Sequence, residues 1–128
     1  MKEAVKTSEA PAAVGPYSQA IKGNGVVYTA GQLGIDPATG EFAGESIVAQ
    51  TKQAMSNIKA VLEAAGSGID QIVKTTIFVT DLGAFVDVNK VYGDFLKAEG
   101  VVSFPARSTV EVAALPLGGL VEIETIAL

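Results

Sequence analysis

The sequence predicts an α+β fold in which two helices pack on one face of a single β-sheet. Runs rich in β-branched residues occur with two longer amphipathic patterns, in the order three strands, helix, strand, helix, two strands. This order is typical of a sheet with both helices on one face. The chain has 128 residues, of which 48% are hydrophobic and 18% charged, so residues 1–128 are expected to form a single domain around one core.

Six segments are predicted to be strands, because β-branched or alternating residues lie between turn residues. They are an edge strand near Val5 and residues 17–21, 26–34, 71–79, 107–113 and 120–127. Prolines and a glycine exclude a helix across residues 10–16. Gly31 lies inside the third strand, where a glycine indicates either a bulge or a close approach of another group to the backbone.

Two helices are predicted from apolar residues at helical spacing. The first has Ser46 as its N-cap and Gly66 as its C-cap, and its expected buried stripe comprises Ile47, Val48, Thr51, Met55, Ile58, Val61, Leu62 and Ala65. The second starts near Asp81 and ends at Gly100, and it is expected to bury Phe85, Val88, Tyr92, Phe95 and Leu96. Asn89 lies one position past that stripe, at its border.

The last two strands are joined by a short connection, which favours antiparallel pairing between them. Period two places Arg107, Thr109 and Glu111 on one face of the first, and Glu122, Glu124 and Ile126 on one face of the second. Arg107 is therefore expected beside Glu122 or Glu124. The alternation of side chains along a strand does not distinguish these two glutamates, because they lie on the same face. No helix remains to cover the other face of the sheet, although residues 71–79 carry apolar or branched side chains on both faces. We therefore expect the chain to self-associate through that face.

Composition narrows the possible functions. The formal net charge is −5 with 9 Lys and Arg residues and no basic run, so a nucleic-acid partner is not expected. No apolar stretch reaches the length of a membrane helix, and the N-terminal residues lack the apolar region of a signal peptide, so we expect a cytoplasmic protein without a membrane partner. Cysteine and histidine are absent, and the acidic residues form no tight cluster, so no metal site is expected.

The chemistry left to this chain must use arginine, carboxylates, tyrosine, hydroxyls, backbone groups or water. Arg107 follows Pro105, which fixes its own φ and stiffens the approach to the strand. A guanidinium held in this way can take a carboxylate with two parallel hydrogen bonds, although a weak surface ion pair fits the same residue. A partly buried glutamate can activate water and a tyrosine such as Tyr17 can orient it, which suffices for hydrolysis of an electrophilic C=N bond.

Several motifs resemble the reactive intermediate deaminase A family, also called the YjgF/YER057c/UK114 family. The resemblance runs almost end to end and rests on segments 10–20, 30–32, 73–79, 104–113 and 121–124. They read APAAVGPYSQA, AGQ, VKTTIFV, FPARSTVEVA and VEIE, in the order of the family's motifs.

This resemblance implies a chorismate-mutase-like fold assembled as a homotrimer, with sites in clefts between subunits. It implies hydrolysis of enamine and imine intermediates such as 2-aminoacrylate and 2-aminocrotonate to 2-oxo acids and ammonia, a form of metabolite damage control. Those intermediates are released by pyridoxal-phosphate-dependent dehydratases, so a functional link to such enzymes follows. The ligands would be small 2-imino and 2-oxo acids, and no cofactor is implied.

The resemblance also assigns roles. Arg107 takes the carboxylate-binding position, Glu122 rather than Glu124 places the attacking water, and Tyr17 reaches in from one side of the cleft. Backbone near Gly31 and Thr109 would supply further hydrogen bonds, and Asn89 and Phe85 would lie near the pocket wall.

Two positions depart from the pattern of many family members. Ala30 stands where a serine is frequent, which puts rate or substrate preference in question, and Thr109 stands where a cysteine is frequent, which removes a thiol-based redox role. The main alternative function is a regulatory or chaperone-like protein that binds small carboxylates in the same cleft without turnover. Ribonuclease or translation-inhibitor activity, the third reading, fits poorly with the charge of −5.

Overall fold

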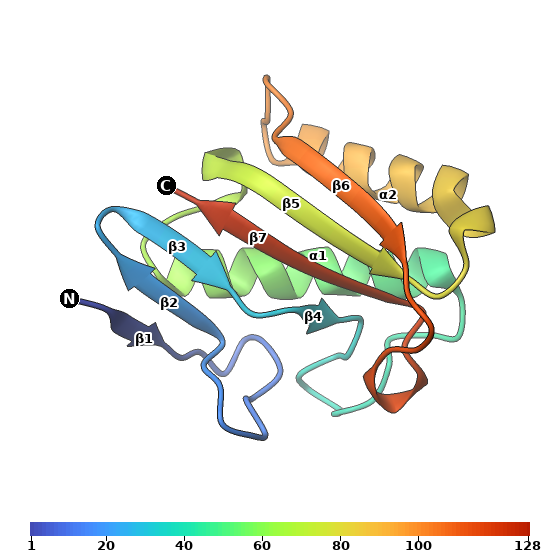
Figure 1. Ribbon diagram of the computed structural model, residues 1–128, viewed down its shortest axis with the longest axis horizontal. Coiled ribbons are helices and arrows are strands. Elements are labelled where there is room, and N and C mark those ends of the chain that lie inside the picture. Colours follow the sequence, from blue (N-terminus) through green and yellow to red (C-terminus); the bar gives the residue numbers. More distant parts are fainter.

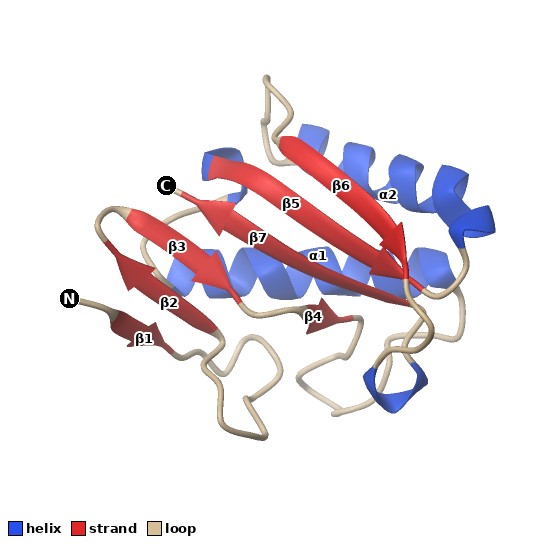
Figure 2. Ribbon diagram, viewed as in Figure 1, coloured by secondary structure: helices blue, strands red, loops and turns tan.

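A computed structural model describes residues 1–128 as a twisted seven-stranded sheet with two helices behind it (Figures 1 and 2). The strands are β1 (Glu3–Val5), β2 (Ala20–Gly23), β3 (Val26–Thr29), β4 (Gln32–Leu33), β5 (Ile72–Val79), β6 (Ala106–Glu111) and β7 (Val121–Ala127). The helices are α1 (Ile47–Ala64) and α2 (Phe85–Ala98), and short 3₁₀ turns occupy Ile69–Gln71, Leu82–Ala84 and Pro116–Gly118. The predicted α+β class and the placement of both helices on one face are confirmed.

The sheet has the order β1-β2-β3-β7-β5-β6, with β4 also paired to β7. All pairs are antiparallel except β5 with β6, which are parallel and joined through α2. The expected antiparallel pairing of the last two strands is therefore wrong, because β5 lies between β6 and β7. A strand–helix–strand unit returns β6 alongside β5 in the parallel sense, and the segment 112–120 is long enough to carry the chain across the end of β5.

The first strands are shorter than predicted. The second begins at Ala20, because Gln19 turns inward and its side-chain amide donates to the carbonyl oxygens of Thr7, Ala10 and Pro11. The predicted third strand breaks at Ala30 and Gly31 into β3 and β4, which pair with successive parts of β7.

The residues that flank both helices agree with the caps that the sequence indicates. The Ser46 hydroxyl accepts a hydrogen bond from the backbone N–H of Ala49, and Gly66 has the positive φ of 81° expected just after a helix. Asp81 caps the 3₁₀ turn that leads into α2 rather than α2 itself, and Gly100 follows α2 with a φ of 81°. One expectation for α1 is wrong, because Val48 is 46% exposed and lies outside the buried stripe.

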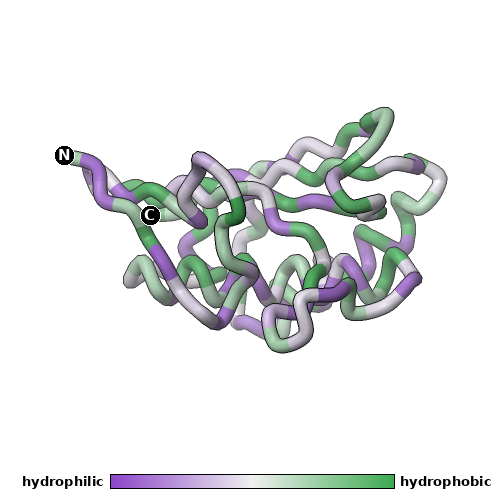
Figure 3. The backbone as a smooth tube through the Cα atoms, turned by 90° about the horizontal axis from the view of Figure 1, so that it is seen from below, coloured by the Kyte–Doolittle hydropathy of each residue, from purple (hydrophilic) through white to green (hydrophobic).

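The core lies between the sheet and the helices. Its fully buried members include Met55, Ile58 and Leu62 of α1, Leu96 of α2, and Ile77 and Ile123 of the sheet. The opposite face of the sheet has no layer over it, and along the strands hydrophobic residues are interspersed with hydrophilic ones (Figure 3). Its exposed apolar side chains include Tyr28, Val73 and Val110. Neither helix combines the length and the hydrophobicity needed to cross a membrane.

Candidate active site

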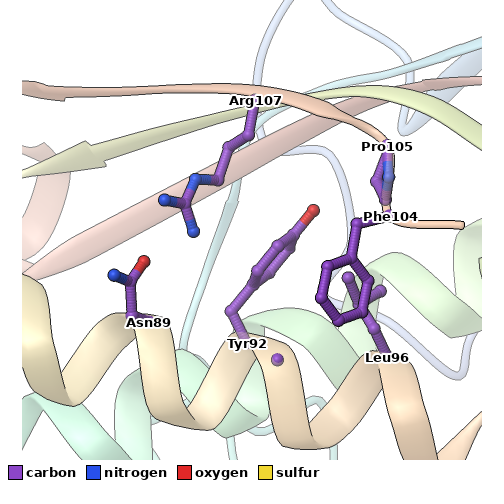
Figure 4. A pocket seen from close by; sticks show the side chains of 7 residues that line it. Asn89, Tyr92, Leu96, Phe104, Pro105 and Arg107 are labelled. Atoms are coloured by element: carbon purple, nitrogen blue, oxygen red, sulfur yellow. The ribbon is translucent and has the colours of Figure 1, made fainter.

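Arg107 lies near the start of β6 and points toward α2 (Figure 4). Its guanidinium carbon is 5.5 Å from the centroid of the Phe85 ring and 5.5 Å from that of the Tyr92 ring. The ion pairs of the chain are Lys59 with Glu99 and Lys90 with Asp94, so Arg107 has no carboxylate partner within its own chain. Aromatic faces hold the guanidinium in place while its N–H groups stay available for an anion.

Tyr92 is itself fixed between the helix and the sheet. Its hydroxyl donates a hydrogen bond of 2.8 Å to Thr75 Oγ1, and Thr75 is the partner of Arg107 across β5 and β6. Burial raises the pKa of the Tyr92 hydroxyl, against the opposing effects of the Thr75 hydrogen bond and the Arg107 charge. Tyr92 is therefore a neutral, ordered wall for the guanidinium.

Two buried polar atoms beside Arg107 lack hydrogen-bond partners. They are Oδ1 of Asn89 on α2 and Oγ1 of Thr109, which lies two residues after Arg107 on the same side of β6. Buried polar atoms in folded proteins are nearly always paired, so these two have hydrogen-bonding capacity that a bound group could use. Together with Arg107 they can hold a small anion that also carries a polar group.

Arg107 lines a pocket of about 360 Å³ between β6 and α2 (Figure 4). Its walls comprise Asn89, Tyr92, Gly93, Leu96, Phe104, Pro105 and Arg107. The structure thus brings together four residues that the sequence analysis named, namely Arg107, Thr109, Asn89 and Phe85. Sequence reasoning assigned Tyr92 and Leu96 to the core only, although Phe85, Asn89, Tyr92 and Leu96 share one helix face by their spacing.

Glu122 lies on the uncovered face of the sheet. It is half-buried, and burial raises the pKa of its carboxyl, with a smaller contribution from the charge of Glu124. Gly31 lies directly against it, since a Cβ placed at residue 31 would be 2.7 Å from Glu122 Cδ. Of the two alternatives expected at Gly31, a bulge or a close approach, the structure shows a close approach. Glu124 is exposed and has no such neighbour.

Arg107 and Glu122 lie on opposite faces of the sheet. Arg107 pairs with Thr75 of β5, which faces α2, whereas Glu122 pairs with Phe78. Thr75 and Phe78 are an odd number of residues apart on one strand, so their partners point in opposite directions. The expectation that these two charged groups are neighbours is wrong within one chain, and the misplaced strand pairing is the reason.

Tyr17 lies in a third place, on the loop before β2. Its side chain is 52% exposed, and its hydroxyl oxygen accepts a long hydrogen bond of 3.5 Å from the backbone N–H of Val14. It borders a separate hollow of about 570 Å³ formed mainly by the N-terminal segment. One chain thus carries three separate groups: the Arg107 pocket, the pair of Glu122 and Gly31, and Tyr17.

The fold and the Arg107 pocket define a small α+β protein with an arginine-lined pocket at one edge of its sheet. The family model described as Endoribonuclease L-PSP matches residues 7–128, and the chain belongs to this family. This confirms the resemblance to the reactive intermediate deaminase A group, because a protein of that name from Arabidopsis thaliana is 49% identical over 98% of this chain and 65% of its own length.

Two further proteins illustrate the likeness. The 2-iminobutanoate/2-iminopropanoate deaminase of Capra hircus is 45% identical, over 99% of this chain and 90% of that protein. The crystal structure of E. coli TdcF with bound serine superposes with a TM-score of 0.95 at 38% identity and covers 98% of both chains.

Proposed function

We propose that this chain is a hydrolytic deaminase of reactive enamines and imines, which it converts to 2-oxo acids and ammonia. The observation that carries the proposal is Arg107, held between two aromatic rings without a carboxylate partner and next to two unsatisfied polar atoms. The names of the relatives from Arabidopsis thaliana and Capra hircus support this activity. The serine bound to TdcF supports a ligand that carries a carboxylate.

Arg107 is the proposed anchor for the substrate carboxylate. Its planar fork donates two parallel hydrogen bonds, which fix both the position and the orientation of the ligand. The Thr109 hydroxyl then donates a hydrogen bond to the carboxylate. The Asn89 side-chain oxygen accepts a hydrogen bond from the iminium N–H. In this position the threonine supplies a hydroxyl, where the family resemblance implies a thiol in many members.

A second copy of the chain completes the proposed site. Arg107 and Glu122 cannot meet within one chain, and the sheet face that bears Glu122 is uncovered and partly apolar. Packing that face and its edges against neighbouring copies brings Glu122, Gly31 and Tyr17 of one copy to the Arg107 pocket of the next. A closed ring of such head-to-tail contacts has cyclic symmetry, and the family resemblance favours a homotrimer.

The proposed reaction is hydrolysis without a cofactor. An enamine such as 2-aminocrotonate first takes a proton at C3 to give the iminium of 2-iminobutanoate. Glu122 accepts a proton from water as the water oxygen bonds to C2, and it returns that proton to the nitrogen of the resulting carbinolamine. The C–N bond then breaks with release of ammonia, while the C2 hydroxyl loses its proton to solvent and becomes the carbonyl of the 2-oxo acid. Each turn thus consumes one imine and one water and yields one 2-oxo acid and one ammonia. The pKa of Glu122 is raised by burial, which strengthens its ionised form as a base.

A binding protein without turnover is the second candidate, favoured by one observation. The anchoring groups Arg107, Asn89 and Thr109 are complete within one chain, whereas the proposed catalytic Glu122 lies apart from them. Ribonuclease activity, which the family description suggests, has little support here, since the net charge is −5 and no basic surface run is present.

A coupled assay separates these candidates. A threonine dehydratase generates 2-aminocrotonate in the presence of this protein, and release of 2-oxobutanoate is followed with time. Acceleration over spontaneous hydrolysis that depends on both Arg107 and Glu122 supports the deaminase. Binding of 2-oxobutanoate without any acceleration supports the regulatory alternative. Loss on Arg107→Ala but not on Glu122→Ala would refute the water-placing role of Glu122.

A further inference from the structure

Tyr17 lies on an N-terminal loop, residues 12–18, that has few hydrogen bonds. The loop leads into β2 (Figure 1), and its hydrogen bonds are internal: the Tyr17 N–H donates to the Gly15 carbonyl, and the Val14 N–H donates to the Tyr17 hydroxyl. Residues 12–17 are exposed. A segment with so few contacts keeps a fixed position only when its two ends are held.

The side chain of Gln19 holds the N-terminal end of this loop. It is 3% exposed, and its Oε1 accepts a hydrogen bond of 2.7 Å from the Thr7 N–H. Its Nε2 donates to three carbonyl oxygens, those of Pro11 at 2.7 Å, Thr7 at 3.1 Å and Ala10 at 3.3 Å. Buried polar groups whose hydrogen bonds are all made hold their neighbours in one arrangement.

The backbone of Gln19 connects the other end of the loop to the segment beside Glu122. Its carbonyl oxygen accepts a hydrogen bond of 2.8 Å from the Ala30 N–H, one step beyond the last pair of the β2–β3 ladder. Gly31 follows Ala30 and lies against the Glu122 side chain. One residue therefore fixes the N-terminal loop relative to the backbone that contacts Glu122.

We propose that Gln19 is a positioning residue, which sets the place of Tyr17 relative to Glu122. This inference rests on the proposed function, because it assumes that Tyr17 and Glu122 act in one site. Gln19 is buried, so it acts through the N-terminal loop rather than on the substrate. Its backbone bond to Ala30 does not involve the side chain, so a substitution of Gln19 releases only the N-terminal end of the loop.

The test removes the amide and keeps the buried volume. Methionine is about as long as glutamine but has no amide, so Gln19→Met breaks the contacts with the N-terminal segment. The kcat on 2-iminobutanoate is measured for this variant alone and combined with Tyr17→Ala. Gln19→Met should lower kcat about tenfold in the wild-type background and less than about twofold in Tyr17→Ala, because residues that act through one another are not additive. KM should change little, since the Arg107 anchor is untouched.

Gln50→Met is the matched control. Gln50 is 4% exposed, and its amide bonds the Gly44 carbonyl and the Leu120 N–H, outside the N-terminal loop. Its effect on kcat should be the same in both backgrounds. A tenfold loss from Gln19→Met in both backgrounds, or no loss in either, would overturn the positioning role. An effect of Gln50→Met that also disappears in Tyr17→Ala would overturn it too, because general loosening would then explain both variants.

A measurement without turnover keeps this inference separate from the proposed function. The chain contains no tryptophan, so Tyr17→Trp introduces a single indole fluorophore on the N-terminal loop. Adding Gln19→Met should raise the acrylamide quenching constant of that fluorophore about twofold or more, because the released loop exposes it. If the wild type shows no deaminase activity but quenching rises, the proposed function fails and the hold of Gln19 on the loop stands. Unchanged quenching would overturn the inference.

Amide exchange on the wild type tests the same contact without a variant that must fold. The Thr7 N–H has Gln19 Oε1 as its acceptor. It should exchange at least about a hundredfold more slowly than in an unfolded chain, because the acceptor is a buried side chain held on four sides. Exchange at the rate of an unfolded chain would show that the Gln19 side chain does not hold the N-terminal segment and would overturn the positioning role.

Discussion

The Arg107 pocket and the Glu122 carboxylate occupy opposite faces of one sheet, and they differ in what surrounds them. Arg107 lies between β6 and α2, against two aromatic rings and beside two buried polar atoms without partners. Glu122 lies on the face that no helix covers, with Gly31 as its close neighbour. The helix layer thus builds the binding half of the proposed site, and the proposed proton-transfer half lies on the uncovered face.

Removing the anchor should have the largest effect. Arg107→Ala is expected to lower kcat/KM on 2-iminobutanoate by on the order of 10³, because both hydrogen bonds to the carboxylate are lost. Arg107→Lys is the matched control that keeps the charge, and it should recover only part of the loss since lysine lacks the planar fork. Steady-state kinetics and calorimetric binding of 2-oxobutanoate measure both effects. Full activity in Arg107→Ala would remove the anchor from the proposed mechanism.

The carboxylate on the other face should act on the rate rather than on binding. Glu122→Gln is expected to reduce kcat by on the order of 10² while 2-oxobutanoate binds nearly as before. Glu124→Gln provides the control, because Glu124 is exposed on the same face of the same strand, and it should change kcat by less than about twofold. Equal losses in the two variants would show that the face contributes charge rather than a particular base.

Gly31 links the backbone to the position of that base. In Gly31→Ala the new Cβ would lie 2.7 Å from Glu122 Cδ, so the carboxylate must move. The moving group is the end of a flexible side chain, which predicts a kcat about tenfold lower with a thermal midpoint within about 4 °C of the wild type. A large drop in the thermal midpoint would instead indicate that Gly31 serves folding.

The pH dependence should reflect the raised pKa of Glu122. Burial favours its protonated form, so the rate should fall as the pH drops through a value above the ordinary range of glutamate. The same shift means that the ionised Glu122 carboxylate slightly lowers the free energy of unfolding. This destabilisation is fully present above the pKa of Glu122 in the folded state and disappears below its pKa in the unfolded state. Glu122→Gln should therefore be slightly more stable than the wild type at pH 7, and thermal melts should converge near pH 4 or below. A Glu122→Gln variant that is less stable at pH 7 would contradict the desolvated environment.

Local signals in the sequence predicted much of the fold. Ser46, Gly66 and Gly100 mark helix ends correctly, because caps depend on a few neighbouring residues. Gly31 was rightly associated with a close approach, although which group approaches it was not visible before the strands were ordered. Both helices on one face followed from the order of the elements.

The errors concern relations between distant segments. A short connection after β6 suggested a hairpin, but β5 takes the place between β6 and β7. That one error in strand order predicted that Arg107 and Glu122 are neighbours. In the structure their partners on β5 are an odd number of residues apart, so the two side chains lie on opposite faces of the sheet. The contact of the Tyr92 ring with the Arg107 guanidinium was also missed. The helical spacing of Tyr92 indicates a buried residue, but it does not indicate which side chain of another element will pack against the ring. The roles of Arg107, Glu122 and Tyr17, and the homotrimer, stay predictions.

Subunit complementation tests the central claim, that each site joins Arg107 of one copy to Glu122 of another. Arg107→Ala and Glu122→Ala are each purified, shown to have lost activity, and refolded together in equal amounts. In a ring of head-to-tail contacts a site is intact only where one variant follows the other in the right order, so about a quarter of the wild-type activity should return. A mixture that stays as inactive as its parents, although mixed oligomers are present by mass spectrometry, would contradict the shared site.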